Sequence, residues 1–466
     1  MSVQTRTDPT IGFATQEEET AFDSLPVEGE LPPWLAGSLV RTGPAKFEVG
    51  DRPLRHWFDG LAMLHRYTFA EGRVSYGSRF LHSRAYRAAR ETGELRYSEF
   101  ATDPCRSLFA RVSSLFRPAL SDNGVVNVSR VGDELLALTE TPLPVVFDAE
   151  TLEAAGVAYE PPGTLTTAHP HHDPARGELV NFAAHLGPRS EYRFYAQRSR
   201  SEQRVIASHP VREPAYVHSF GMTDRHLVLA EGPFVVNPLK LALGRRPYIE
   251  NYRWEPDRGA RFLVFDRESG ALRGEYRTDA FFTFHHVNAF ERDGEVVVDL
   301  CAYEDPSIID ALYLDRLREG PALPPVRARR YVLDLDGGGV DARNLHDGDL
   351  ELPRIAYRAR NGRPYRYVHG VGGADGEWID RIVKVDVEDG SATTWSEAGS
   401  YPGEPVFVPE PGREEEDAGV LLSVVLDAGR EASFLLVLDA DTLEELARAA
   451  VPNRVPFSFH GQFFGG

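Results

Sequence analysis

Strand–turn–strand units recur along the whole chain, and they constrain its fold more than any other feature. Residues 64–81 read LHRYTFAEGRVSYGSRFL, two alternating apolar segments around the turn AEGR. The turns of such units carry Asp, Gly or Ser, which tolerate positive φ or form local hydrogen bonds. We expect further units at 144–159, 262–276, 381–395 and 434–449, and strand pairs around 124–139, 226–236, 294–303 and 328–335.

These units lie roughly 40 to 70 residues apart, with long loops between them. That spread is typical of a β-propeller, in which four-stranded blades surround an axis, and a double sandwich is the structural alternative. Helical spacing of apolar residues occurs at 108–120 and 305–320. Because no linker-like segment divides the chain, we expect one domain over residues 1–466.

The formal net charge of −20 disfavours nucleic acid as a partner, because its phosphates would be repelled. Two cysteines, Cys105 and Cys301, form neither a metal motif nor a disulfide framework, which is typical of a reducing cytoplasm. The N-terminus is unlike a signal peptide, and no segment has the apolar length of a membrane span. Only Lys46, Lys240 and Lys384 are lysines; a salt-loving or GC-rich prokaryotic source and codon bias alone explain this equally well.

Four histidines far apart in the sequence lie in apolar or aromatic surroundings. They are His169 in TAHPHHDP, His218 in YVHSFGMT, His285 in FTFHHVNAF and His460 in FSFHGQFFGG. Imidazole is the commonest side-chain metal ligand, although a lone buried histidine is more often a hydrogen-bonded core residue. His460 stands close to the chain end, yet the phenylalanines around it indicate an interior position.

Spacing alone does not identify a ligand set. His171 and His172 compete with His169, and His286 adjoins His285. Neighbours on a strand point to opposite faces, so only one of His285 and His286 can face a given site. The inner strands of propeller blades line the axis, where histidines from four blades would be able to converge. The pattern is compatible with a metal site without specifying its members.

Several longer segments carry a more specific signal. They include GSLVRTGPAKFEVG, HWFDGLAMLHRYTF, TAHPHHDP, FTFHHVNAFERDGEVVVDLCAYED, SYPGEPVFVP and FSFHGQF. In this order, and from end to end, the chain resembles the carotenoid cleavage oxygenase family, above all its animal-type branch of β-carotene oxygenases and the retinoid isomerase. The resemblance implies an all-β fold, a seven-bladed β-propeller with a dome of helices and loops over an axial metal site.

The resemblance also implies a non-haem Fe2+ cofactor, one per subunit, held by four histidines from separate blades. Matched motif by motif, the ligands are His169, His218, His285 and His460. Three glutamates would accept hydrogen bonds from the bound imidazoles, which fixes the tautomer and raises ligand basicity. By the same matching these are Glu140 in LTETP, Glu351 in LELPRIAY and Glu404 in PGEPVFV.

The implied activity is that of a dioxygenase, an oxidoreductase that uses O2 to cleave a C=C bond of a carotenoid. No catalytic acid or base beyond the metal centre is expected. A rigid apolar polyene needs an apolar, aromatic tunnel beside the metal. Matched tunnel positions are Phe58, Phe100, Thr139, Tyr216 and Tyr303, and for each aromatic residue plain core packing is the alternative.

The expected reaction is cleavage of β-carotene at the 15,15′ bond to give retinal. The alternatives are off-centre cleavage of a carotenoid or apocarotenoid, retinoid isomerisation, and a non-catalytic carotenoid- or lipid-binding propeller. A metal-dependent propeller hydrolase with Ca2+ sites would need carboxylate and carbonyl oxygens rather than imidazoles. The isomerase carries Cys-Cys-Trp where this chain reads Cys301-Ala302-Tyr303, and the loop before Asp103 is shortened, which favours cleavage.

A lipid-soluble substrate also calls for contact with a membrane surface. Residues 105–120 combine an apolar helical face with Arg106, Arg111 and Arg117, a pattern typical of a helix in the bilayer interface. A buried amphipathic helix would show the same pattern. We expect a cytoplasmic protein that associates peripherally with the membrane through this segment.

Overall fold

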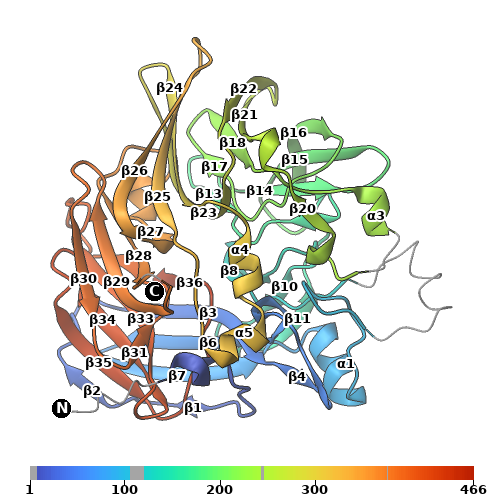
Figure 1. Cartoon of the computed structure of the whole chain (residues 1–466). Helices are drawn as coiled ribbons and strands as arrows, with labels where there is room; N and C mark the ends of the chain where they lie inside the picture. Colours follow the sequence, from blue (N-terminus) through green and yellow to red (C-terminus); the bar gives the residue numbers. More distant parts are fainter. Residues whose placement is uncertain (1–7, 105–119, 243–245, 375, 466) are drawn as a thin grey trace.

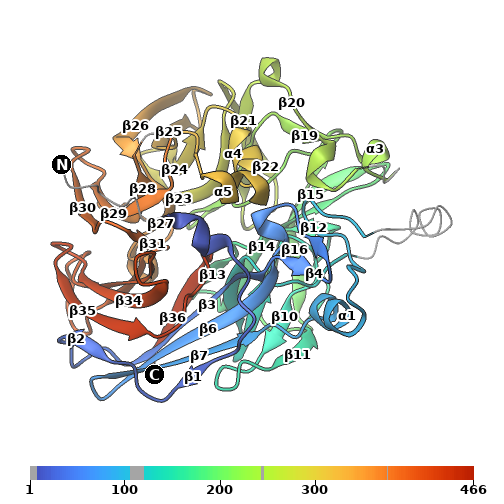
Figure 2. The same cartoon turned by 60° about the horizontal axis from the view of Figure 1, so that its bottom comes forward.

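Seven sheets of antiparallel strands form the blades of a β-propeller, as the sequence predicted (Figures 1 and 2). The computed structural model describes residues 8–104, 120–242, 246–374 and 376–465. Residues 105–119 of the expected membrane-contact segment lie outside these ranges.

Strands from the two ends of the chain share two blades, and this closes the ring. In one blade the last strand, β36 (Gly461–Gly465), pairs with β3 (Gly37–Lys46), followed by β6 (Leu61–Ala70), β7 (Arg73–Phe80) and β1 (Ala21–Phe22). In the other, β2 (Val27–Gly29) extends a sheet of late strands. These are β35 (Glu445–Val451), β34 (Ala432–Asp439) and β33 (Gly419–Asp427), with β31 (Ser400–Pro402) and β32 (Val406–Pro409) beside β33.

The other five blades follow one another along the chain. The second contains β8 (Asn127–Val131), β9 (Glu134–Leu138), β10 (Val145–Phe147) and β11 (Ala154–Val157). The third contains β12 (Leu165–Thr166), β13 (His171–Asp173), β14 (Glu178–His185), β15 (Ser190–Gln197) and β16 (Gln203–Val211). The fourth contains β17 (Gly221–Met222), β18 (His226–Glu231), β21 (Ala260–Asp266) and β22 (Leu272–Thr278).

The fifth blade contains β23 (Phe282–Arg292), β24 (Glu295–Tyr303), β25 (Arg327–Asp334) and β26 (Val340–Asp349). The sixth contains β27 (Glu351–Arg354), β28 (Tyr367–Gly373), β29 (Ile379–Asp386) and β30 (Ala392–Ser396). Two small ribbons lie outside the blades, β4 (Glu48–Val49) with β5 (Arg52–Pro53) and β19 (Phe234–Val236) with β20 (Tyr252–Trp254). First strands of neighbouring blades contact one another, β17 with β23 and β23 with β27, and therefore surround the axis.

The five predicted strand–turn–strand units are confirmed as β6–β7, β10–β11, β21–β22, β29–β30 and β34–β35. The pair expected around 226–236 is wrong, because β18 pairs with β17 and β21, whereas β19 pairs with β20. The chain leaves the blade at Gly232, where a Cβ atom would lie 2.8 Å from the Phe281 carbonyl oxygen.

Helices are few. The helix expected at 305–320 is two short ones, α4 (Ser307–Ala311) and α5 (Leu314–Glu319), because Tyr313 between them is extended. The sequence analysis missed α1 (Arg84–Thr92), which begins after the N-cap Ser83 and ends at the left-handed Gly93. The remaining helical segments among the described residues are α3 (Pro238–Ala242), α6 (Tyr357–Arg360), η1 (Pro9–Phe13), η2 (Trp57–Asp59), η3 (Ile249–Asn251) and η4 (Pro256–Arg258).

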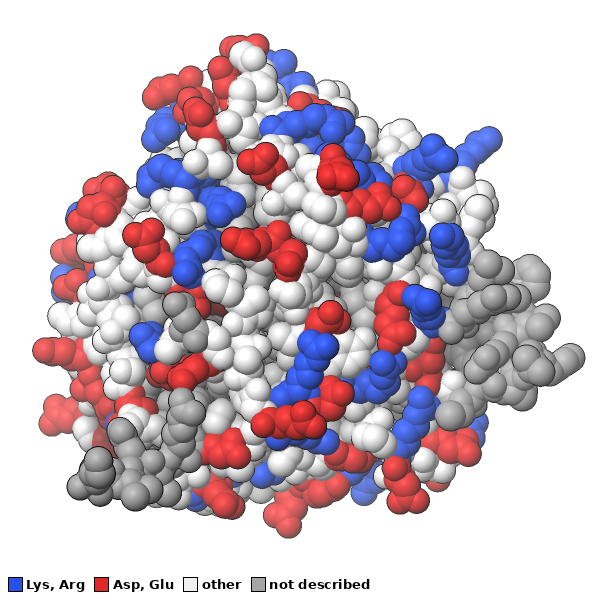
Figure 3. All heavy atoms as spheres, in the orientation of Figure 1, with Lys and Arg blue, Asp and Glu red and all other residues white. Residues whose placement is uncertain are grey.

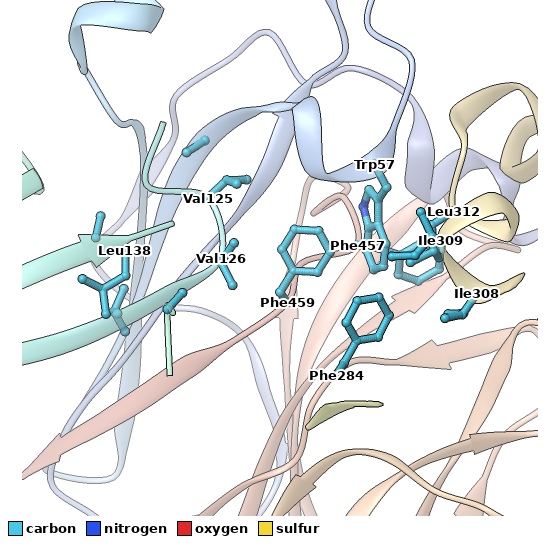
Figure 4. Packing of buried hydrophobic residues seen from close by; sticks show 14 of the residues in the cluster. Trp57, Val125, Val126, Leu138, Phe284, Ile308, Ile309, Leu312, Phe457 and Phe459 are labelled. Atoms are coloured by element: carbon cyan, nitrogen blue, oxygen red, sulfur yellow. The ribbon is translucent and has the colours of Figure 1, made fainter. Parts of the chain in front are cut away.

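Apolar side chains from η2, α4, β23 and the C-terminal tail gather into one cluster near the axis (Figure 4). The rings of Trp57 and Phe459 pack at a tilt with centroids 4.3 Å apart, and Phe284 and Ile308 face the same space. Charged side chains of both signs are interspersed over the outer surface in the view of Figure 3. Among the described residues, no helix combines the length and the apolar character that a bilayer crossing requires.

Candidate metal centre

The structure brings His169, His218, His285 and His460 together at the axis. His169 precedes β13, His218 precedes β17, His285 lies in β23 and His460 directly precedes β36, so the four side chains come from four blades. One ring nitrogen of each lies within 4.8 Å of those of the other three. His218, His285 and His460 are buried, and His169 is half-buried.

The ring nitrogens that face one another are the Nε2 atoms. Those of His169 and His218 are 3.0 Å apart, and those of His285 and His460 are 3.1 Å apart. Two nitrogens that bind one metal ion at about 2.1 Å and at right angles would be separated by about 3.0 Å. The spacing therefore fits a single ion bound by imidazoles.

Three glutamates fix the tautomers of three of these rings. The Nδ1 atom of His218 lies 2.7 Å from Glu140, that of His285 lies 2.5 Å from Glu351, and that of His460 lies 2.7 Å from Glu404. In a neutral ring, an N–H at Nδ1 leaves Nε2 as a lone pair.

In the pair of His285 and His460, both Nε2 atoms are therefore acceptors that face each other at 3.1 Å. Two lone pairs at this distance repel unless a cation lies between them. Imidazole ligands suit iron, zinc, copper and nickel, so the donor set fits a transition-metal ion.

Each glutamate has further donors. The Tyr216 hydroxyl donates to Glu140 at 2.6 Å, and the Tyr303 hydroxyl donates to Glu351 at 3.2 Å. Glu351 also accepts the backbone N–H of Leu352 at 2.6 Å. These donors hold the carboxylates in place against the imidazole rings.

Glu404 is paired with cations as well. Arg354 Nε lies 3.0 Å from one carboxylate oxygen without a hydrogen bond, and Arg354 NH2 donates to the other oxygen at 3.4 Å. Arg41 NH1 lies 3.6 Å from that second oxygen. Gly461 donates its backbone N–H to the same carboxylate at 3.0 Å. A side chain at Gly461 would collide with Arg41, because a Cβ atom would lie 2.4 Å from Cγ.

Burial and charge set the protonation states. Burial lowers the pKa of His218, and it lowers the pKa of His460 to about 4 although Glu404 acts in the opposite direction. Burial also lowers the pKa of His169 well below its usual value. Burial alone would raise the pKa of Glu404, but Arg354 and His460 bring it to about 2. Neutral imidazoles, which can bind a metal, and an ionised Glu404 are the result.

The structure places the other histidines of the two ambiguous clusters away from the group of four. The register of β23 shifts on both sides of His286, and while His285 faces the axis, His286 Nδ1 contacts the Ser219 hydroxyl at 2.8 Å. His171 contacts the Tyr357 hydroxyl at 2.9 Å, and His172 lies 3.3 Å from the Ser129 hydroxyl. None of these three nitrogens belongs to the group of four.

An apolar cavity adjoins the histidines. Of the five predicted tunnel residues, Phe58 and Tyr303 line it together with His218, His285 and His460. Phe100 packs behind Phe58 with ring centroids 5.1 Å apart, and Tyr216 lines a smaller neighbouring pocket. Thr139 is half-buried beside Glu140 and does not line the cavity.

The sequence analysis did not single out Trp57, Phe284, Trp378 and Phe459, which line the same cavity. Phe284 and Phe459 directly precede ligand-site histidines, a signal that was available in the sequence. Arg41 and Arg354 were also missed, because an arginine at an interior site cannot be distinguished from a surface one without a fold.

Comparisons with known proteins agree with this geometry. A family model described as retinal pigment epithelial membrane protein matches residues 13–465. The mitochondrial carotenoid-cleaving dioxygenase of Macaca fascicularis is 36% identical over 521 residues, covering 97% of this chain and 93% of the relative. The β,β-carotene 15,15′-dioxygenase of Gallus gallus is 33% identical over 523 residues, with coverage of 97% and 98%.

Solved structures are similar over the same length. Cobalt-substituted Synechocystis ACO, an apocarotenoid oxygenase, superimposes with a TM-score of 0.88 and 28% sequence identity. The match covers 99% of this chain and 100% of that one. A metal ion is thus named for a protein with this fold.

Proposed function

The chain belongs to the carotenoid oxygenase family of the retinal pigment epithelial membrane protein, a family of non-haem iron enzymes, and from this premise we propose its reaction. We propose that it holds one Fe2+ per chain and cleaves β-carotene with O2 at the 15,15′ bond to give retinal. The relative from Gallus gallus, which carries that activity in its name, supports this choice of bond.

One observation carries the proposal. Four imidazoles converge, and three of them, His218, His285 and His460, border a cavity whose other walls are largely apolar. His169, His218, His285 and His460 are the proposed ligands, and Glu140, Glu351 and Glu404 hold three of them. A binding propeller without catalysis would need the cavity but not this set of imidazoles.

One group of residues would hold the metal and another group would hold the substrate. Bound Fe2+ would supply the activation of O2. Trp57, Phe58 and Phe459 exclude water and pack against the polyene, which fixes the position of one double bond beside the histidines. No side chain of the cavity is assigned a proton transfer.

A second candidate is cleavage of an apocarotenoid. The similarity to Synechocystis apocarotenoid oxygenase favours it, since the fold and the chain length match throughout. The two candidates use the same metal centre and differ in the substrate that fits the cavity.

Product analysis tests both. The iron-loaded protein is incubated with β-carotene or with a β-apocarotenal in the presence of O2, and the products are identified by mass. Retinal as the only product of β-carotene supports 15,15′ cleavage, whereas a β-apocarotenal with a C13 ketone indicates off-centre cleavage. Absence of any product from both substrates would contradict the enzymatic function.

We also propose that the protein is cytoplasmic and binds the membrane surface through residues 105–120. The support is the apolar face flanked by Arg106, Arg111 and Arg117 in the sequence. Sedimentation with phosphatidylcholine vesicles tests it. We expect Leu108→Glu to reduce co-sedimentation and Leu239→Glu, a change at an exposed leucine, to leave it unchanged. Equal binding of both variants would argue against this segment.

A further inference from the structure

Two arginines, one buried and one half-buried, distinguish Glu404 from the other two glutamates of the metal centre. Arg41 in β3 is 1% exposed, and Arg354 ends β27. Both guanidinium groups lie at the carboxylate of Glu404, with Arg354 the nearer at 3.0 Å and Arg41 at 3.6 Å. Two positive charges therefore face the carboxylate that contacts His460.

The other two carboxylates have no such cation among the contacts of the described residues. Glu140 accepts from a tyrosine hydroxyl and from His218. Glu351 accepts from a tyrosine hydroxyl, a backbone N–H and His285. The three histidine–glutamate pairs are alike in geometry, but they differ in charge.

We propose that Arg354, supported by Arg41, is a positioning residue that weakens the donor strength of His460 toward the metal and offsets negative charge around the site. A carboxylate raises the basicity of the imidazole that it contacts. A guanidinium group paired with the same carboxylate reduces this increase in the basicity of the imidazole. His460 is then a weaker donor than His218 and His285.

The net charge around the site also predicts that the two arginines weaken metal binding. Three carboxylates surround the four neutral imidazoles, and the two arginines offset two of these negative charges. Buried charges are little screened, so each guanidinium group also opposes the binding of a divalent cation. Loss of the Arg354 charge should tighten metal binding.

A purely mechanical role predicts the opposite. Arg354 also contacts the carbonyl oxygen of Gly461, and Arg41 donates to that of Phe459 at 3.0 Å. If these arginines only hold the C-terminal tail in place, removing one would loosen His460 and weaken metal binding. The sign of the change in affinity separates the two roles.

The inference rests on the proposed metal centre, and Co2+ titration of the full-length chain tests both. Binding is followed by visible absorption and calorimetry in the wild type, Arg354→Gln, Arg354→Lys and His460→Ala. We expect Arg354→Gln to bind Co2+ about tenfold more tightly, with displaced absorption bands, and Arg354→Lys to behave as the wild type. Arg41→Gln should tighten binding less, because Arg41 lies farther from Glu404.

Weaker or unchanged binding by Arg354→Gln, or equal behaviour of the Gln and Lys variants, would overturn the role of the charge while leaving the metal centre intact. If Arg354→Gln fails to fold, Arg41→Gln replaces it in the test: tighter Co2+ binding would support the role of the charge, and weaker or unchanged binding would overturn it. If the wild type bound no Co2+, or if His460→Ala kept the wild-type spectrum, the metal centre itself would be contradicted.

Discussion

At the scale of single residues, the carboxylates set the tautomer and the orientation of the imidazole rings that they contact. Glu351 accepts a hydrogen bond from the Nδ1–H of His285, and the Nε2 lone pair of that ring therefore points toward the other rings. We expect Glu351→Ala to lower Co2+ affinity by roughly 10- to 100-fold, because the ring loses both orientation and basicity. Calorimetric titration measures it, with Glu94→Ala as the exposed control. An unchanged dissociation constant would show that the carboxylate is dispensable.

Sequence spacing alone could not select the ligands. His169 and His171 are separated by one residue, yet only His169 joins the group of four. The shifts in register around His286 cannot be predicted from a pattern of alternating side chains, since a bulge changes the face on which each residue lies. Resemblance to a family selected His169 and His285 where physical reasoning left alternatives open.

At the scale of elements, the C-terminal tail is held by its contact with β3. A Cβ atom at Gly43 would lie 2.4 Å from Cβ of Ser458, two residues before His460. We expect Gly43→Ala to displace the tail, to cost about 1–3 kcal/mol of stability and to weaken metal binding. Thermal unfolding and Co2+ titration measure the two effects. Gly77→Ala is the matched control, because no heavy atom lies within 4 Å of its added Cβ. Equal stability of both variants would refute the contact.

The strand–turn–strand units were predictable because each is a local pattern with its own turn residues. Which strands form each blade was harder to predict, because β36 and β2 complete sheets made by strands at the other end of the chain. Such pairings carry no local signal. The helix α1 was missed although Ser83 and Gly93 mark both of its ends, since its apolar face is short.

At the scale of the whole molecule, the two shared blades join the chain ends. We propose that residues 1–466 behave as one domain, because both β3–β36 and β2–β35 must break before the ring opens. Chemical denaturation followed by circular dichroism and by tryptophan fluorescence should give one coincident transition. Two separated transitions would indicate independently folding parts.

Buried histidines away from the ligand set make stability depend on pH. Burial lowers the pKa of His56 and His65 to about 3 and that of His369 to about 4. The unfolded chain takes up these protons near pH 6.5, so the stability present above that pH is lost as the pH falls toward 4. Burial also lowers the pKa of His171 to about 4 and that of His286 to about 3, and these histidines together outweigh the opposite effect of Glu99 and Asp59, whose pKa burial raises.

We therefore expect the metal-free protein to have a smaller free energy of unfolding at pH 5.5 than at pH 7.5. Each histidine contributes at most about 1.4 kcal/mol per pH unit below pH 6.5. Urea titrations at the two pH values measure the difference. Equal or greater stability at pH 5.5 would mean that these rings are not buried as neutral groups.

The iron content of the purified chain after loading with Fe2+ tests the central claim most directly. It is measured for the wild type, for single alanine variants of His169, His218, His285 and His460, and for His185→Ala, a control on β14 outside the site. We expect one iron per chain in the wild type and in the control, and loss of iron in each of the four variants. Full iron occupancy in any one of them would contradict a centre held by four histidines.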